Sequence, residues 1–218
     1  MPDPDRADIR ERPLYSQREA AFVVGVSPSV LRRWLGPTGE GPLIRVADPE
    51  SRRLSFNNVI EAYVLRSLQT RHGVSSRAVR RAVVFAEGKL GVERLLLRKE
   101  LRWSGDLFWD QLSDLVNLSE SGQLAMRQVV ESYLNRVDWD AADLPARLFP
   151  RVVSAPEARN VVVDPRLGFG QPVVAGVGVG TSVVARRIDA GETVEDVARD
   201  YGVGVAAIAD AVVYQAGV

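Results

Sequence analysis

Arginine side chains are the groups in this chain whose type and spacing could best do chemistry with a partner. Arg32 and Arg33 stand side by side on what we predict to be the polar face of a short helix. A guanidinium group can donate two parallel hydrogen bonds to guanine or to a phosphate, whereas a lysine ammonium acts as a point charge. Only two of the 28 basic residues are lysines. We therefore expect this segment to bind a polyanion.

The charges of the chain are segregated although its net charge is zero. Residues 12–103 carry 17 basic and 8 acidic side chains, while residues 104–150 carry 3 and 8 and residues 151–218 carry 6 and 8. A basic front joined to an acidic rear is typical of a nucleic-acid-binding segment attached to a body with another task. Charge alone leaves chance clustering on a solvated surface as the alternative.

Several classes of chemistry have little to build on. There is no cysteine, which excludes disulfides and thiolate catalysis, and the single histidine, His72, cannot supply a metal cage. The aspartates at 138, 140 and 143 lack the pattern of a calcium loop and are expected to form a solvated acidic loop. We therefore expect no enzyme, no cofactor and no metal. The charged N-terminus is no signal peptide and residues 172–185 are too short to cross a bilayer, so a cytoplasmic protein with no membrane partner is expected.

Two short helices position the paired arginines. Ser16 with Glu19 predicts a capping box at the start of the first helix, and Gly25 ends it. Ser27 and Pro28 then begin a second helix. Its apolar side chains form one face, which leaves Ser29, Arg32 and Arg33 pointing outward. Two helices joined by a turn containing glycine, with basic residues on the outer face of the second, are typical of a helix-turn-helix.

The segments that follow complete a small domain and lead into a mixed region. Strands at 43–46 and 52–56 are expected to pair as a hairpin, or wing. A helix capped by Asn57 or Asn58 follows the wing, and another spans about 77–87 with Ser75 or Ser76 as its cap. Further along, residues 95–103 and 107–109 are predicted to form a second hairpin. Apolar residues from Met126 to Val137 recur at helical spacing.

This front part resembles the MerR-type winged-helix DNA-binding domain over roughly residues 14–86. The resemblance lies in Tyr15-Ser16-x-x-Glu19-Ala20-Ala21, Gly25-Val26-Ser27-x-Ser29-x-Leu31-Arg32-x-Trp34, the wing sequence at 52–56 and the step Gly73-Val74-Ser75. Unlike typical members, the chain has Gly88 and Gly91 where a long dimerisation helix would continue. The resemblance and the residues together imply a set of DNA contacts: Tyr15, Arg18, Ser27, Ser29, Arg32, Arg33, Arg45, Arg52 and Arg53.

The tail carries a second pattern of this kind. A short strand at 161–163 precedes a helix at about 182–189, a helix at 194–201 capped by Thr193, and a last helix at 205–215. The last helix has no lysine or arginine, which makes it a poor reader of DNA and suits it to the core or to a protein interface.

From about residue 155 onward the tail resembles a short helix-turn-helix domain of unknown function found on many antitoxins. The matching words are Asp164-Pro165-Arg166-x-Gly168-x-Gly170-Gln171-Pro172-Val173, Val179-x-Thr181-Ser182-Val183, Ala190-Gly191-Glu192-Thr193-x-Glu195-Asp196-x-Ala198 and Tyr201-Gly202. With its MerR-like front, the chain resembles a VapB-like antitoxin of a toxin–antitoxin module. The resemblance implies a PIN-like ribonuclease toxin as partner, with Arg166, Arg186 and Arg187 as candidate toxin-binding residues.

The sequence thus predicts a mainly α fold with small β hairpins. We expect a flexible N-terminal arm at 1–13, a winged helix-turn-helix at 14–88, a mixed α+β middle at 89–152 and a small helix-turn-helix domain at 153–218. The expected function is an antitoxin that binds its toxin and represses its own operon as a homodimer on operator DNA. The alternative is a stand-alone MerR-like regulator whose middle region senses a small molecule.

Overall fold

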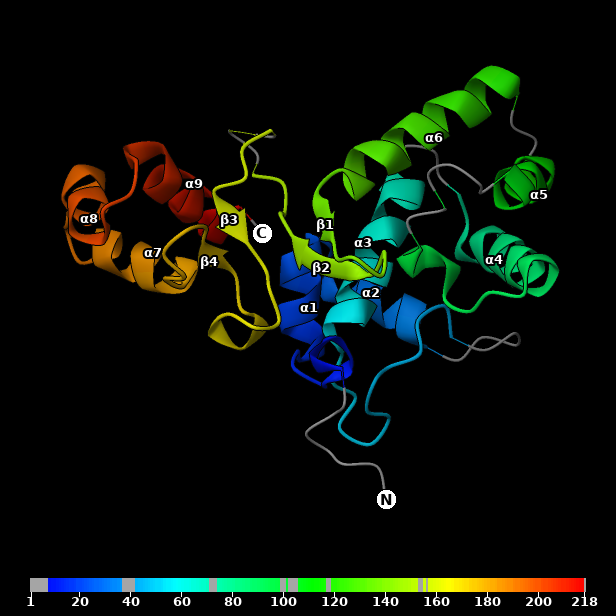
Figure 1. Cartoon of the computed structure of the whole chain (residues 1–218), viewed down its shortest axis with the longest axis horizontal. Coiled ribbons are helices and arrows are strands. Elements are labelled where there is room, and N and C mark those ends of the chain that lie inside the picture. The colour runs from blue at the N-terminus through cyan, green and yellow to red at the C-terminus, as the bar shows by residue number, and fades with distance from the viewer. Residues whose placement is uncertain are drawn as a thin grey trace.

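The computed structural model describes residues 8–36, 42–70, 74–98, 101, 106–116, 119–152, 155 and 157–217. Within them the chain is mainly helical, with two small antiparallel hairpins, which confirms the predicted mainly α fold with small β elements. The tail helices gather at one end of the molecule and the helices of the middle at the other, with the first helix between them (Figure 1).

The front of the chain begins with the two helices that the caps predict. Helix α1 spans Gln17–Val24 and α2 spans Pro28–Leu35. Helix α3, Phe56–Thr70, packs against α1, and α4, Ser76–Leu90, begins at the predicted cap Ser75. The start of α3 corrects the prediction of a cap at Asn57 or Asn58.

Helix α3 begins at Phe56 because Ser55 and Asn58 satisfy each other's backbone. The Asn58 amide N–H donates to Ser55 Oγ at 3.2 Å, and the Ser55 N–H donates to Asn58 Oδ1 at 3.1 Å. This is a capping box in which asparagine takes the place usually held by glutamate. Phe56, expected to end a strand, is therefore the first residue of the helix.

The predicted wing is a loop with isolated bridges. Residues 43–46 form no strand, and pairing is limited to the bridges Asp48–Arg53 and Tyr15–Leu54. The backbone groups that a partner strand would have satisfied are bonded elsewhere. The N–H groups of Leu43 and Ile44 donate to the Trp34 carbonyl, and the side chain of Asn58 bonds the Arg45 carbonyl and the Ala47 N–H. The prediction of a two-stranded wing is therefore wrong.

The middle differs from its prediction in the same way. The hairpin expected over 95–103 and 107–109 is instead a 3-10 turn, Leu95–Leu97, followed by α5, Asp106–Val116. Residues 99, 100 and 102–105, which include most of the link between the two expected strands, lie outside the described residues. Phe108, Trp109 and Leu112 are buried on one side of α5. Their spacing is helical, but a segment as short as 107–109 does not reveal this periodicity.

The predicted amphipathic helix is present as α6, Glu120–Leu134. Val137 does not belong to it but begins β1, Val137–Trp139, which pairs antiparallel with β2, Pro145–Leu148.

The front and the middle share one hydrophobic core. A single cluster of buried side chains runs from Tyr15 through α3 and α4 to Leu148 and Val163. The rings of Tyr63 on α3 and Tyr133 on α6 lie 4.8 Å apart, and α4 packs along α5 (Figure 1). The expected boundary at residue 88 therefore does not divide the hydrophobic core, because residues on both sides of it belong to the same cluster.

Residues 8–13 are docked onto this core. They contain a 3-10 turn, Ile9–Glu11. The Arg10 guanidinium lies 2.6 Å from Asp140, and Asn57 Nδ2 donates to Glu11 at 2.5 Å. The expectation of a flexible arm over 1–13 does not hold for 8–13, and residues 1–7 lie outside the described residues.

The tail has a core of its own. Strands β3, Val161–Val162, and β4, Val173–Val174, pair antiparallel. They precede α7, Thr181–Asp189, α8, Val194–Tyr201, and α9, Val205–Ala216. Ile208, Ala211 and Tyr214 of α9 are buried against α7 and α8, in agreement with the prediction that α9 serves a core or an interface.

The tail docks on α1 through a short 3-10 turn, Gly168–Gly170. The Tyr15 hydroxyl donates to the Gly170 carbonyl at 2.8 Å, and the Phe22 and Tyr214 rings meet edge to face at 5.2 Å. Gly170 has φ +78°, and a Cβ there would clash with the Tyr15 hydroxyl. Only glycine allows the tail to approach α1 this closely.

We predict that Gly170→Ala destabilises the protein more than Gly176→Ala. Both glycines have φ near +80°, so both variants carry the left-handed strain of about 1–2 kcal/mol. Gly176 has open space around its missing Cβ, whereas Gly170 faces Tyr15, and the added clash should cost about 1–3 kcal/mol more. Urea unfolding of both variants measures the difference. Equal losses would contradict close docking of the tail on α1.

Candidate nucleic-acid interface

Hydrogen bonds fix both ends of α1, including the turn that leads into α2. Ser16 and Glu19 form the predicted capping box, with the Ser16 N–H donating to Glu19 at 2.7 Å. Gly25 ends α1 in the left-handed conformation, φ +72°. Arg66 reaches across from α3 and donates to the Val24 carbonyl at 2.7 Å. The angle between the two helices is thus fixed by a glycine and by a cation at the end of α1.

The orientation of α2 about its own axis is fixed by its buried side. Leu31 and Trp34 are buried, and the Trp34 indole N–H donates to Gln69 on α3 at 3.0 Å. Gln69 in turn donates to Ser76 Oγ at 2.9 Å, which ties α2 to both α3 and α4. Residues on the opposite side of α2 therefore face the solvent.

Arg32 and Arg33 occupy that exposed side. Both are exposed, and neither forms an ion pair or hydrogen bond with its side chain to any other described residue. Arg94 shows the contrast, because its guanidinium is held by Glu61 at 2.9 Å and by Glu11. Burial alone would lower the pKa of Arg94, but its bonds to these carboxylates raise it. Arg32 and Arg33 remain free to meet an external anion.

Ser27 and Ser29 lie at the start of α2. Ser27 Oγ accepts from the Val30 N–H at 3.4 Å and lies 2.9 Å from Ser29 Oγ. Both residues are exposed, so the first turn of α2 offers two hydroxyl groups beside the two guanidinium groups. Hydroxyl groups at such a position can bond phosphate oxygens.

The loop that replaces the wing contributes two further exposed cations. Arg45 and Arg52 are exposed, and their side chains have no partner among the described residues. Arg45 directly follows Ile44, whose N–H is bonded to the Trp34 carbonyl, so the loop starts against the last turn of α2. Arg18 on α1 is also exposed and has no described partner.

Arg53 and Tyr15 have structural positions. Arg53 donates to the carbonyl groups of Pro13 and Leu14 at 3.0 and 2.6 Å, which fixes its guanidinium on the N-terminal segment. Tyr15 is fully buried, and burial raises the pKa of its hydroxyl. Since that hydroxyl is bonded to Gly170, Tyr15 has no exposed group to offer a phosphate. The expectation that Tyr15 contacts DNA is corrected accordingly.

The three candidate arginines of the tail differ in how free they are. Arg166 is exposed, with its guanidinium 3.8 Å from Asp164, and Arg186 is exposed and bonds only back to the Ser182 carbonyl among the described residues. Arg187 is held by Glu192 and by Asp200 at 2.5 Å, and stacks on Tyr201 at 5.1 Å. Its bonds to these carboxylates raise its pKa. Arg187 thus links α7 to α8, so its guanidinium is less available to a partner than those of Arg166 and Arg186.

Sequence reasoning missed Phe169 as a candidate. Its side chain is 87% exposed, between two glycines of the turn that docks on α1. The triplet Gly168-Phe169-Gly170 carries the available signal, because glycine on both sides of an aromatic residue indicates a turn that presents it.

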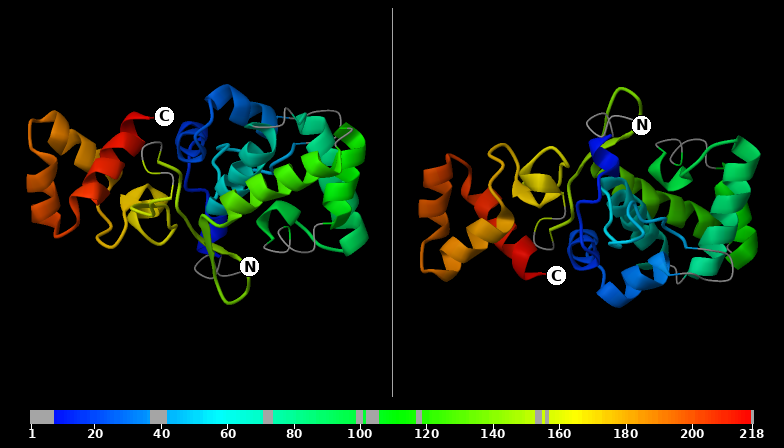
Figure 2. Two further views of the ribbon diagram at one scale, coloured as in Figure 1. Left: turned by 90° about the horizontal axis from the view of Figure 1, so that it is seen from above. Right: turned by 90° about the horizontal axis from the view of Figure 1, so that it is seen from below.

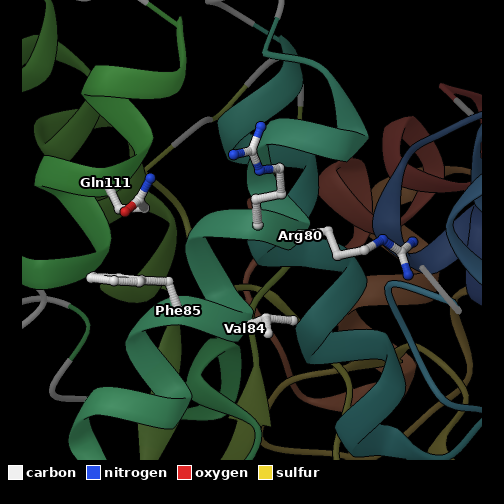
Figure 3. A pocket seen from close by; sticks show the side chains of 5 residues that line it. Arg80, Val84, Phe85 and Gln111 are labelled. Atoms are coloured by element: carbon white, nitrogen blue, oxygen red, sulfur yellow. The ribbon is translucent and has the colours of Figure 1, made fainter.

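A groove between α4 and α5 bears on the alternative of a small-molecule sensor. It encloses about 450 Å³ and is lined by Arg80, Arg81, Val84, Phe85 and Gln111. Phe85 and Gln111 face each other across it, while the guanidinium of Arg80 points away (Figure 3). Only Gln111 comes from the region 89–150, where a sensor pocket was expected.

Two further searches cover the described residues. Within them, no group of three or more His, Asp or Glu side chains could hold a metal ion. The aspartates at 138 and 140 instead bond to Arg159 and Arg10, and His72 lies outside the described residues. The helices of the described ranges include none long and apolar enough to span a membrane.

The fold and the site define a mainly helical protein in which α2 exposes cations and a helical tail is docked on α1. Comparison with known proteins places it more narrowly. The chain is 30% identical to "Putative antitoxin VapB45" of Mycobacterium tuberculosis, with 88% of this chain and 89% of that protein covered. The chain therefore belongs to the family of VapB45.

Two further proteins are similar to the chain over most of its length. "Uncharacterized protein Rv2308" of Mycobacterium tuberculosis is 24% identical, over 94% of this chain and 90% of that protein. The crystal structure of Rv2018 from the same organism superposes with a TM-score of 0.73 at 28% identity, covering 91% of this chain and 96% of that one. Residues 161–215 match the family described as protein of unknown function DUF433. The tail thus corresponds to a separately recognised module.

We predict that Glu19→Gln removes a pH-dependent part of the stability. Burial alone would raise the pKa of Glu19, but hydrogen bonds from Ser16 and the charge of Arg53 outweigh it and lower the pKa. A carboxylate with a lowered folded pKa stabilises the fold above its unfolded pKa of about 4.3, and this stability is lost as the pH falls through the folded pKa. The variant should be less stable than the wild type at pH 7, and this deficit should be smaller at pH 3.

Urea unfolding at both pH values measures this effect, with Glu50→Gln in an exposed turn as the control. A deficit of Glu19→Gln that is the same at pH 7 and pH 3 would contradict the role of the ionised carboxylate.

Proposed function

We propose that this protein is an antitoxin that binds operator DNA through α2 and neutralises a PIN-like ribonuclease through its tail. The observation that carries the proposal is the pair Arg32 and Arg33, exposed and without described partners on a helix whose orientation is fixed. The membership in the VapB45 family supports the antitoxin part.

The DNA-binding part follows from charge and shape. A helix with outward guanidinium groups fits the major groove, where arginine bonds guanine bidentately. Arg18, Arg45 and Arg52 would hold phosphates beside it, and Ser27 and Ser29 would do so at the start of α2. One such module buries only about 600–1,000 Å², which is little for tight operator binding. We therefore propose a homodimer on an inverted repeat.

We assign toxin binding to the tail for two reasons: the tail is poorly suited to bind DNA, and it matches the separate family DUF433. Helix α9 has no basic residue, and Asp210, its acidic one, is buried and bonded to Asn160 at 2.8 Å. A surface of this kind does not attract a duplex. Arg166 and Arg186 keep exposed guanidinium groups that could reach carboxylates of a ribonuclease.

The test of DNA binding compares two double variants of equal charge. Arg32→Ala/Arg33→Ala should lose about 1–3 kcal/mol of operator binding for each arginine that contacts a base. Arg186→Ala/Arg199→Ala removes the same charge from the tail and should bind as the wild type does. Fluorescence anisotropy with promoter DNA measures both. The wild-type affinity should fall by about 0.9 log units per log unit of salt for each phosphate contacted.

Neutralisation is read separately, by growth of cells that express the ribonuclease encoded beside this gene. Arg32→Ala/Arg33→Ala should rescue growth as well as the wild type does. Unchanged operator binding by that variant would refute the role of α2, and failure of the wild type to rescue growth would refute the antitoxin proposal.

The regulator remains the second candidate, supported by the groove between α4 and α5. It requires a ligand that changes DNA affinity and no ribonuclease gene next to this one. A neighbouring reading frame with spaced aspartates and glutamates would favour the antitoxin.

A further inference from the structure

Phe169 is presented to solvent in a way that the fold itself does not explain. Its side chain is 87% exposed, far more than the other large apolar side chains of the described residues. Its backbone lies in the left-handed region, with φ 55° and ψ 33°, where a side chain with a Cβ is strained. Strain of this kind concentrates at functional sites, because folding alone would favour a glycine.

The turn that carries Phe169 is held rigidly from several sides. The N–H groups of Leu167 and Gly170 donate to the carbonyl groups of Asp164 and Leu167 at 2.9 and 2.8 Å. Tyr15 anchors the Gly170 carbonyl, and Gln171 donates to Glu19 at 3.2 Å. An aromatic side chain on an ordered turn loses little conformational entropy when it binds, which favours its use as an anchor.

Two exposed arginines lie next to the start of the turn. Arg147 and Arg166 both approach the carboxylate of Asp164, at 3.0 and 3.8 Å. The Asp164 side chain is only 3% exposed, whereas the two arginine side chains are 52% and 57% exposed. Two cations share one buried anion, so both guanidinium groups stay partly exposed, while Glu19 is the acidic side chain bonded to Gln171. A partner of the two arginines is expected to be acidic.

The position of the turn separates it from the proposed DNA surface. Helix α1 lies between α2 and the docked turn with its neighbouring hairpin, in the views from above and from below (Figure 2). A duplex bound along α2 would therefore be separated by α1 from the turn 168–170. This placement favours a protein partner over nucleic acid.

We propose that Phe169 is the anchor by which the tail binds its protein partner, inserting into an apolar pocket rimmed by carboxylates. This inference rests on the proposed function, in which the partner is the ribonuclease encoded beside this gene. Arg147 and Arg166 then pair with the acidic rim, while Phe169 supplies the apolar contact at its centre.

The test uses the full chain and the purified, catalytically inactive form of that ribonuclease in isothermal titration calorimetry. Phe169→Gly is the key variant, because it relieves the left-handed strain while it removes the ring. It should unfold at a urea concentration equal to or higher than that of the wild type, yet bind the ribonuclease about 30-fold more weakly, the fold-change of a hot spot. Leu124→Ala removes an exposed apolar side chain on α6 and should bind normally.

The charge of the rim is tested by Arg166→Glu, which should weaken binding and slow association at low salt, with the difference shrinking as salt rises. If the wild type binds and Phe169→Gly binds within twofold of it, the anchor is refuted while the antitoxin function stands. If Phe169→Gly instead loses operator binding, the ring contacts DNA and the protein-anchor proposal is refuted. If the wild type does not bind the ribonuclease, the proposed function and the anchor fail together.

Discussion

The contact between Tyr15 and Gly170 is the constraint on which the arrangement of the molecule depends. A fully buried tyrosine at the entrance to α1 donates its hydroxyl proton to a carbonyl 155 residues further along the chain. A buried hydroxyl that lost this acceptor would cost free energy, so the tail is held against α1. The same turn bonds Glu19, which caps α1. The same contacts therefore fix the start of α1 and hold the tail against it. As a result, the exposed surface of α2 and the exposed turn at 168–170 keep fixed positions relative to each other.

The arginines sort into two physical groups. Arg136 and Arg66 are satisfied by other parts of the chain: Arg136 donates to the carbonyl groups of Phe149 and Pro150, and Arg66 to that of Val24. A buried cation without such partners would be costly. Arg32 and Arg33 need no internal partner because water solvates them in the free protein. The separation of basic and acidic segments in the sequence is thus preserved at the surface of α2, where the charge is available to an external anion.

The sequence predicted elements well where a short-range signal decides them. Ser16, Gly25 and Ser75 act through bonds to residues within four positions, so the caps of α1 and α4 and the end of α1 could be placed from the sequence. Most of the errors involve partners beyond this range. Residues 43–46 form no strand because their backbone groups bond to the Trp34 carbonyl and the Asn58 amide. Tyr15 is buried by the tail. Arg187 is bonded to Asp200 of α8 and to Glu192 in the turn before it. Of the candidate site, the exposed arginines of α2 were predictable from helical periodicity, whereas the placement of Phe169 required the docked turn.

The central claim is that one rigid molecule offers DNA and protein partners two different surfaces on opposite sides of α1. Hydrogen–deuterium exchange of the free chain, the chain with operator DNA, and the chain with both operator DNA and the ribonuclease tests it most directly. The account predicts that DNA protects residues 28–35 and leaves 164–171 unchanged, and that the ribonuclease then protects 164–171 without releasing 28–35. Protection of the same segment by both partners, or protection of 164–171 by DNA alone, would contradict it.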